Sequence, residues 1–385
     1  MISSDYLSDP IKYSELYIHD QVQNPQNFNA VIGEQDEMFL WELGQCHGNV
    51  EQARWRYFAI GKQLMESITS IVDWRWGNFS QVRKFLDFGC GYGRLTRFLI
   101  NNLPPQRIWG ADIQRDAVKF QVAYHAINGL ISTSVPEEFK TEHRFDCIYV
   151  VSLFSHLPPH TFQRWLEVLY NLLDPSGILI MSTHSMSLLP PQDRNNNRGI
   201  LFFPDSESRA LDKNEYGATY VTEAFMRQVI KRVTGQSIFR CIKRGLCGWQ
   251  DLYLISKSQA RDMATYKPSI GPFGSFDGCK IDDDGRVSFW GWACELREKY
   301  SNCQVLLFRN GELMKCKLDR LDRPDVTQHI EDSNLVNPGW SFTARREQFK
   351  PDDVVMIKLV GQQGIETVIH LNAFQQMLQS FTQYQ

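Results

Sequence analysis

A glycine-rich turn between two apolar segments constrains the fold of this 385-residue chain more than any other feature. Residues 86–94 read Leu-Asp-Phe-Gly-Cys-Gly-Tyr-Gly-Arg, so the end of an apolar strand is followed by three glycines and then by the start of a helix. Glycines allow a ligand to approach the backbone closely at the carboxyl edge of a sheet, where open α/β folds bind their ligands. The turn therefore predicts a strand, a ligand-binding loop and a helix, in that order.

The segments that follow alternate between short apolar runs and helical patterns. This alternation is typical of right-handed strand-helix-strand units around a parallel sheet, which places the chain in the α/β class. Two later apolar runs flank a turn that contains glycine, and they predict a closing antiparallel hairpin. The expected strands are 85–88, 108–112, 145–151, 178–181, 238–242 and 252–255, and the expected helices between them are 95–100, 117–127 and 161–173.

The residues before and after this α/β segment show other sequence patterns. Residues 1–82 are expected to form a helical N-terminal cap, with a long helix that begins near Asn49. The α/β domain is expected at 83–257, and the prolines and glycines of 258–272 predict a linker. Residues 273–385 show period-two patterns and turn signals, which predict a small antiparallel β-sandwich domain with a C-terminal helix. Docking of this helix on its own domain is one interpretation, and a homodimer contact is the other.

Composition narrows the class of protein. Lys and Arg number 41 against 44 Asp and Glu, so the chain lacks the basic excess of a nucleic-acid binder. No apolar run approaches the ~18 residues of a membrane span, and the N-terminus lacks the pattern of a signal peptide. The nine cysteines have no paired spacing, which favours free thiols in a reducing cytoplasmic protein.

Two acidic residues near the turn indicate which ligand it binds. Arg94 stands where a dinucleotide-binding fingerprint needs glycine or alanine, which disfavours NAD. Asp87 precedes the first glycine by two residues, so it would repel a pyrophosphate but would suit a ligand with ammonium and sulfonium charges, such as S-adenosylmethionine. Asp112 ends the next strand, where a carboxylate accepts hydrogen bonds from ribose hydroxyls.

With these residues, the chain resembles the class I S-adenosylmethionine-dependent methyltransferases over residues 83–257. The first motif of that family is an acidic residue followed by G-x-G-x-G, and the segments 145–158 and 173–179 look like its fourth strand and the turn into its fifth. The resemblance implies a Rossmann-like methyltransferase fold, with a mainly parallel seven-stranded sheet and an antiparallel last strand. It also implies ribose contacts from Asp112 and an adenine contact from Ile113. The cofactor-binding residues expected in all are Asp87, Gly89, Cys90, Gly91, Gly93, Asp112, Ile113 and Val151.

The sequence also limits which molecule could accept the methyl group that such an enzyme transfers. No Asn-Pro-Pro-Tyr-like sequence follows the fourth strand and no Pro-Cys pair is present, which disfavours methylation of a nucleic-acid base. Transfer to a hydroxyl is assisted by a general base. His156 and His184 follow the fourth and fifth strands at the ligand edge, so both are candidate catalytic residues, with a structural role as the alternative. A sugar or glycan hydroxyl, or a related small molecule, is the favoured acceptor by analogy.

The predicted sandwich resembles small β-domains attached to bacterial glycosyltransferases and methyltransferases of surface-polysaccharide loci. Trp290, Trp292 and Trp340 suit stacking on sugar rings where they are exposed, whereas core packing of at least two of them is the simpler interpretation. Asp282–Asp284 is interpreted as a solvated turn, and no metal site is expected. Two alternative functions stay open, namely a lipid or other small-molecule methyltransferase and a non-catalytic cofactor-binding scaffold with a glycan- or protein-binding sandwich.

Overall fold

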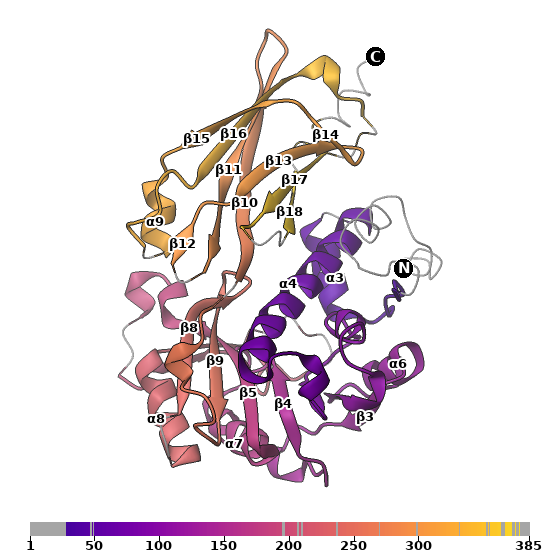
Figure 1. The fold of residues 1–385 in the computed structure, drawn as a ribbon, viewed down its shortest axis with the longest axis vertical. Helices are drawn as coiled ribbons and strands as arrows, with labels where there is room; N and C mark the ends of the chain where they lie inside the picture. The colour runs from indigo at the N-terminus through magenta and orange to yellow at the C-terminus, as the bar shows by residue number, and fades with distance from the viewer. Residues whose placement is uncertain are drawn as a thin grey trace. The chain divides into compact units, whose positions relative to one another are not determined.

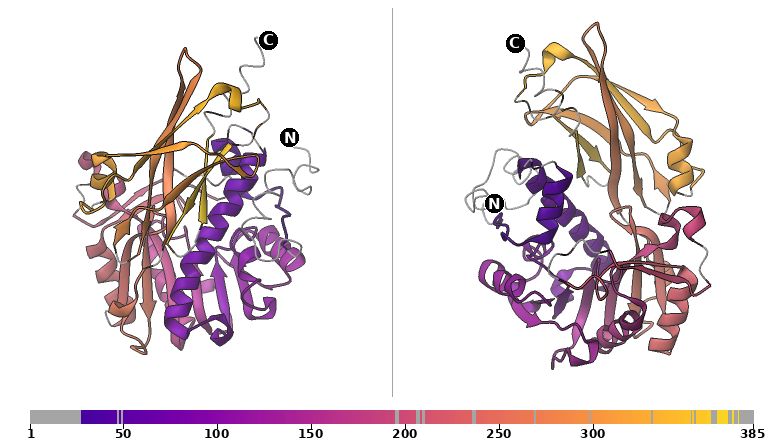
Figure 2. Two further views of the ribbon diagram at one scale, coloured as in Figure 1. Left: turned by 45° about the horizontal axis from the view of Figure 1, so that its top comes forward. Right: turned by 180° about the vertical axis from the view of Figure 1, so that it is seen from behind.

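The computed structural model describes residues 28–371, apart from 47, 49, 195–196, 206–207, 209–210, 236–237, 269, 298, 331, 352, 354 and 363–365, together with Phe374 and Met377. The chain divides into two compact units, which Figures 1 and 2 draw from different sides. Among the described residues, the first unit comprises 28–41 and 60–267, and the second comprises 42–59 and 268 onward. The domain boundaries expected from the sequence stay predictions.

The first unit is built on a sheet with the strand order β3-β2-β1-β4-β5-β9-β8. The first five of these strands are parallel, β9 is antiparallel to β5, and β8 is antiparallel to β9. The predicted Rossmann-like methyltransferase sheet, whose last strand is antiparallel, is therefore confirmed. Its strands are β1 (Phe85–Phe88), β2 (Ile108–Asp112), β3 (Asn128–Ile131), β4 (Phe145–Val150), β5 (Leu173–Ser185), β8 (Phe239–Leu246) and β9 (Gln250–Ser256).

An insertion after β5 extends this sheet at its carboxyl edge. β7 (Ala218–Val221) pairs in parallel with the end of β5, and β6 (Ile200–Phe203) pairs antiparallel with β7. The sequence patterns predict neither of these strands, because neither belongs to the alternation of strands and helices from which the sheet is predicted. The insertion brings Tyr216 and Tyr220 to the edge where β4 and β5 end.

The helices of the first unit bury one apolar side each. α7 and α8 pack against each other and against a core cluster that includes residues of β1, β4 and β5. α4 buries Phe58, Met65, Ile68 and Val72, which confirms the predicted stripe. α8 begins where the Thr222 hydroxyl accepts a hydrogen bond from the Phe225 amide at 3.1 Å, which is a typical N-cap. The helices that lie wholly in the first unit are α5 (Thr96–Leu99), α6 (Arg115–His125), α7 (Pro159–Asn171) and α8 (Glu223–Thr234). The boundary between the two units divides α3 (Glu37–Gln45) and α4 (Val50–Trp76).

The second unit is a sandwich of two antiparallel sheets, as predicted. Asn310 and Gly311 form the turn between β13 and β14, with φ angles of 52° and 83° that suit a tight hairpin. One sheet contains β10 (Ile270–Ile281), β11 (Arg286–Leu296), β12 (Tyr300–Ser301), β15 (Lys317–Leu321) and β16 (Gly339–Arg345). The other contains β13 (Gln304–Arg309), β14 (Glu312–Leu313), β17 (Val355–Val360) and β18 (Glu366–His370), and α9 (Pro324–Ile330) follows β15.

The core of the sandwich includes two residues whose roles were open. Trp340 is fully buried with Phe289 and Phe342, so it is a core residue and is not exposed for stacking on a ligand. Phe374 is also fully buried, with its ring centroid 4.5 Å from that of Phe289. The start of the predicted C-terminal helix thus packs on its own unit, whereas Leu378 and Phe381 lie outside the described residues.

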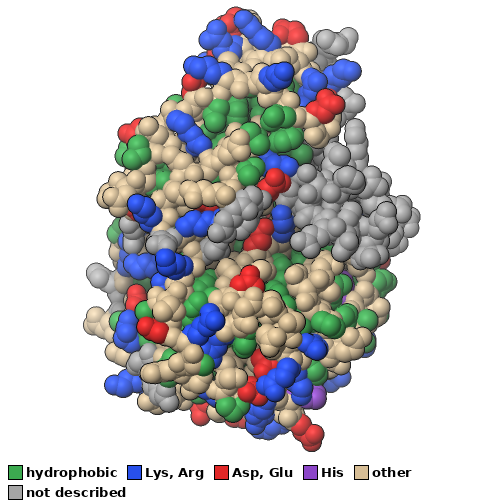
Figure 3. Space-filling model, viewed as in Figure 1, with side chains coloured by type: hydrophobic (Ala, Val, Ile, Leu, Met, Phe, Trp, Pro, Cys, Tyr) green, Lys and Arg blue, Asp and Glu red, His purple; other side chains and the backbone are tan. Residues whose placement is uncertain are grey.

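The surface shows no segregation of charge in the view of Figure 3, where basic and acidic side chains are interspersed. α4 is 27 residues long, but charged residues are distributed along it. None of the helices in the described part of the chain is long and apolar enough to cross a membrane.

We expect Trp340→Ala to destabilise the second unit by about 3–5 kcal/mol, because the substitution removes a fully buried aromatic side chain and leaves a cavity. Urea denaturation of the full chain, followed by circular dichroism, measures this change. The matched control is Trp249→Ala, which removes a 53% exposed tryptophan and should shift stability by less than about 1 kcal/mol. Equal shifts in the two variants would contradict the core assignment of Trp340.

Candidate functional site

The glycine turn after β1 has an open side and a packed side. Gly89, Gly91 and Gly93 have φ angles of 75°, 50° and 86°, a region that side-chain-bearing residues rarely adopt. A Cβ atom added to Gly89 or Gly91 would meet no atom within 4 Å, whereas one added to Gly93 would lie 2.8 Å from His125 Nε2. The first two glycines therefore face space that a ligand can fill, and the third allows the turn to pack against α6.

Two buried side chains hold the turn from its packed side. The Gln121 side-chain amide donates hydrogen bonds to the carbonyls of Cys90 and Gly91, both at 3.3 Å. The Arg97 guanidinium donates to the Gly93 carbonyl at 3.0 Å and to the Tyr92 carbonyl at 3.3 Å. These contacts orient the turn before any ligand binds, because they satisfy its carbonyl groups and fix its curvature. Sequence reasoning missed both residues, since their partners are backbone atoms of a neighbouring element.

Asp112 links the end of β2 to the turn. Its carboxylate accepts a hydrogen bond from the Gly91 amide at 2.8 Å and another from the Gln114 amide at 2.9 Å. Burial raises the pKa of Asp112, and the two amides oppose that effect. A carboxylate has about four acceptor positions, so capacity is left for ribose hydroxyls. Asp112 thus fits the predicted contact and also positions the turn.

Asp87 is a buried carboxylate beneath the turn. It is only 4% exposed, and its hydrogen-bond partner is the Thr96 hydroxyl at 3.4 Å. Burial raises the pKa of Asp87 to about 7, and the negative charge of Asp112 adds to that shift. Opposite Asp87 in the β1–β4 pair lies Tyr149, whose buried hydroxyl has no hydrogen-bond partner among the described residues. An incoming cation would therefore stabilise the ionised form of Asp87.

The remaining predicted cofactor residues lie at the same edge. Cys90 is buried, and its Sγ would lie 3.0 Å from a Cβ added to Gly110, so its side chain packs against β2. Only its backbone is placed to meet a ligand at the turn. Ile113 follows β2 and Val151 follows β4, and both are half-buried.

His156 lies beyond the end of β4 and is oriented by the insertion. Its Nδ1 donates a hydrogen bond to the Gly217 carbonyl at 2.6 Å, because a carbonyl can only accept. Its ring stacks on Tyr216 with a centroid distance of 4.5 Å. Burial lowers the pKa of His156, so the imidazole is neutral near pH 7 and its Nε2 carries a lone pair. Nε2 is therefore the ring atom of His156 that can accept a proton.

His184 lies near the end of β5, with its ring centroid 6.1 Å from that of His156. The Gln250 side-chain amide donates to His184 Nε2 at 3.3 Å and to the Ser152 hydroxyl at 3.2 Å. Burial lowers the pKa of His184 to about 4, and the nearby His156 contributes to that shift. Because its Nε2 already accepts a hydrogen bond, His184 suits a positioning role better than the role of base.

Gln250 and Ser152 are site residues that sequence reasoning missed. Ser152 has a φ of 59°, a strained conformation of a kind that clusters at functional sites. Gln250 is the first residue of β9, and an antiparallel strand begins at the edge where its parallel neighbours end. That topology is the signal that points to Gln250, but it becomes useful only once the strand order is known.

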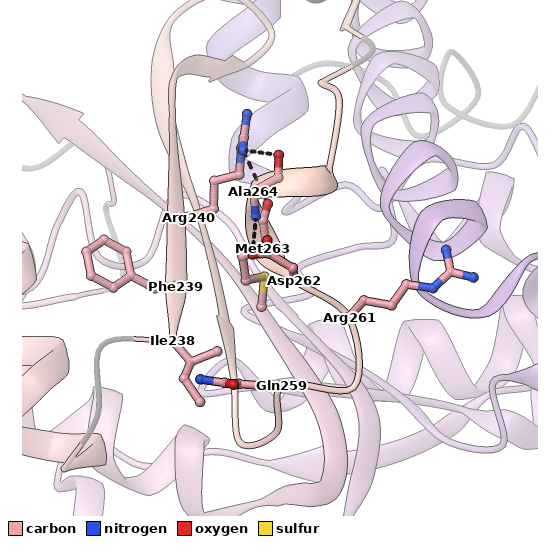
Figure 4. A pocket seen from close by; sticks show the side chains of 8 residues that line it. All are labelled: Ile238, Phe239, Arg240, Gln259, Arg261, Asp262, Met263 and Ala264. Atoms are coloured by element: carbon pink, nitrogen blue, oxygen red, sulfur yellow. Dashed lines mark hydrogen bonds between the residues drawn. The ribbon is translucent and has the colours of Figure 1, made fainter.

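Other groups lie apart from this site. His125 is buried behind the turn, and His160 pairs with Glu215 at 3.5 Å. Within the described part of the chain, no group of three or more His, Cys, Asp or Glu residues could hold a metal ion. The pocket of about 430 Å³ in Figure 4 lies along β8 and the segment 259–264, where the Arg240 guanidinium donates to the carbonyls of Met263 and Ala264. The residues that line this pocket do not include the glycine turn, Asp87, Asp112, His156 or His184.

A family model described as "Methyltransferase domain" matches residues 86–179. This stretch runs from β1 into β5 and holds the glycine turn, Asp112 and His156. The first unit therefore contains a methyltransferase domain of the class I, S-adenosylmethionine-dependent kind.

Two curated relatives match parts of the chain. A cyclopropane-fatty-acyl-phospholipid synthase of Escherichia coli is 28% identical over 101 residues, which is 26% of each protein. A malonyl-acyl-carrier-protein O-methyltransferase of Calditerrivibrio nitroreducens is 26% identical over 149 residues, which is 38% of this chain and 56% of the relative. The chain thus spans about a quarter and about half of the length of these relatives.

Among solved structures, the plantazolicin methyltransferase BamL in complex with a triazolic desmethylPZN analog and SAH is similar to this chain. The sequence identity is 14%, the TM-score is 0.39, and the match covers 58% of this chain and 97% of the other. The assignment of the fold rests on the strand order described above.

We expect the stability of the ligand-free protein to fall between about pH 4 and pH 7 through Asp87. The pKa of Asp87 is about 7 in the folded state and near 3.8 in the unfolded state. The contribution of Asp87 to the free energy of unfolding is therefore fully present below pH 3.8 and is lost as the pH rises through 7. Asp87→Asn should be more stable than the natural protein at pH 8, by on the order of 2–4 kcal/mol, and the gap should close toward pH 4. Thermal unfolding across this range measures the gap, and parallel pH profiles would contradict the assignment.

Proposed function

We propose that the first unit binds S-adenosylmethionine at the glycine turn and catalyses transfer of its methyl group to an acceptor oxygen. The observation that carries this proposal is the open space in front of Gly89 and Gly91. Asp87 lies beneath this turn and Asp112 hydrogen-bonds to it, so two carboxylates accompany a backbone surface that is free to contact a ligand.

The residues around the turn fit the parts of this cofactor. Asp87 suits its positive charges, because ionisation of the buried carboxylate becomes favourable beside a cation. Asp112 retains acceptor capacity for the ribose hydroxyls, and Ile113 and Val151 offer apolar contacts at the two strand ends. The sulfonium supplies an already activated methyl group, so orientation of the acceptor contributes most of the acceleration.

His156 is the base that we propose for the acceptor hydroxyl. The Gly217 carbonyl holds the proton on Nδ1, so Nε2 could take the proton that the acceptor hydroxyl loses. The acceptor oxygen would bond to the methyl carbon as the bond from that carbon to the sulfonium sulfur breaks, leaving S-adenosylhomocysteine. His184 and Gln250 lie beside it and keep the local environment neutral and polar. A neutral pair of histidines avoids a positive charge near the sulfonium.

We further propose that the acceptor is a sugar or glycan hydroxyl, or a related polar small molecule. Polar groups of Ser152, His184 and Gln250 meet next to His156 and hydrogen-bond to one another. A site lined with such groups suits a polar acceptor better than a lipid chain. The ring of Tyr216 beside His156 suits the C–H face of a sugar. The curated O-methyltransferase relative is consistent with transfer to oxygen.

The cofactor part of the proposal is tested by calorimetric titration with S-adenosylhomocysteine. We expect the natural protein to bind it and Asp112→Ala to bind it at least about tenfold more weakly, since a hydrogen bond to a charged group contributes roughly 1.5–3 kcal/mol. The control variant is Asp116→Ala, which removes an exposed carboxylate four residues downstream and should bind normally. Absence of binding by the folded natural protein would overturn the proposed cofactor site. NADH serves as the negative control ligand.

The acceptor part is tested by a screen with labelled S-adenosylmethionine against mono- and oligosaccharides, with acyl carrier protein and phospholipid vesicles as competing classes. On the best acceptor, we expect His156→Ala to lower kcat by about 10²–10⁴ and to leave affinity for S-adenosylhomocysteine unchanged. His160→Ala removes a 58% exposed side chain nearby and is the matched control. Normal turnover by His156→Ala would remove it as the base, and transfer only to vesicles would overturn the glycan assignment.

A further inference from the structure

The outer face of the larger sheet in the sandwich carries two tryptophans. Along β11, Val287, Phe289 and Ala293 point into the core, so Trp290 and Trp292 point away from it. Both are half-buried, although large aromatic residues on a sheet usually face the core. Trp340, in contrast, is fully buried, with its indole nitrogen enclosed in the core.

Small residues lie beside both rings on the neighbouring strands. Gly278 on β10 and Ser341 on β16 pair with Trp290, and Ser275 and Gly339 pair with Trp292. A Cβ atom added to Gly278 would lie 2.8 Å from the ring of Trp290, so the absence of a side chain there lets the ring lie against β10. Trp290 is therefore flanked by small residues on both neighbouring strands. The ring of Trp292 contacts the ring of Phe273 edge-on at a centroid distance of 6.0 Å. Side-chain atoms of Leu321 and Arg323 lie beside Gly339.

The charges on this face are paired. Lys280 on β10 pairs with Asp282, which follows the end of that strand. Lys317 pairs with Asp319, and both lie on β15. Arg323 pairs with Asp277 and Asp325 at the other end of the face. Because each cation has a carboxylate partner, the face offers donors and acceptors without a net field, and this does not suit a charged polymer.

We propose that this tryptophan face, defined by Trp290, Trp292 and the small residues beside them, binds a neutral oligosaccharide. The two side chains are two residues apart on one strand, which separates them by about 7 Å and allows adjacent sugar rings to stack on both. The indole N–H groups donate to sugar hydroxyls, and Ser341 supplies a hydroxyl between the strands. This site lies within the second unit, and its existence does not depend on the proposed methyl transfer.

The test is affinity electrophoresis of the full chain in native gels that contain dextran, mannan, laminarin or, as an anionic probe, hyaluronan. We expect at least one neutral polysaccharide to retard the natural protein. Trp290→Ala and Trp292→Ala should each weaken this retardation roughly tenfold or more, as removal of a central aromatic contact does at other interfaces. Trp249→Ala, which removes an exposed tryptophan from the first unit, should keep it.

A further variant distinguishes loss of the binding surface from loss of the fold. Ser341→Arg keeps both tryptophans and places a long side chain in the space beside Trp290, so it should also abolish retardation. Titration with S-adenosylhomocysteine should give the same affinity for every variant, which separates this proposal from the proposed function. No retardation by any neutral polysaccharide, retardation only by hyaluronan, or equal retardation of Ser341→Arg and the natural protein would each overturn it.

Discussion

The hydrogen bond from the Gly91 amide to the Asp112 carboxylate is the contact on which the site of the first unit depends. It joins the turn after β1 to the end of β2, so two strand ends that are separate in the sequence become one surface. Gln121 and Arg97 hold the same turn through its carbonyl groups. A backbone fixed on one side in this way can leave its other side open to a ligand without collapsing, which lowers the conformational cost of binding.

Electrostatics then divides the carboxyl edge of the sheet into two parts. Around the turn, the buried carboxylate of Asp87 and the half-buried carboxylate of Asp112 favour a cationic ligand. The burial of Asp87 keeps its interaction strong because little water screens it. Beside them, His156 and His184 are kept neutral by burial. A positively charged methyl donor would therefore suit the first part, and the neutral acceptor that we propose would suit the second.

In the sandwich, the residues that indicate a binding site are the half-buried ones on its outer face, whereas the site of the first unit depends on buried groups. A sheet packed on one side usually presents polar residues on the other. Here β11 places Trp290 and Trp292 on that side, among glycine, serine and paired charges. Trp340 belongs to the core cluster that contains Phe289, and the two outer tryptophans do not, although Trp292 contacts Phe273 edge-on.

The sequence by itself determined the glycine turn, Asp87, Asp112 and the parallel sheet with its antiparallel closure, because these depend on the order of residues along the chain and on strand ends that share one edge. Only the tertiary structure decided that Gln250 meets His184, and that Trp340 is buried while Trp290 and Trp292 are not. Alternation along a strand tells which residues share a face, but the register between strands decides which face is covered. Contacts such as those of Gln121 and Arg97 join side chains to backbone atoms, and a sequence pattern carries no sign of these.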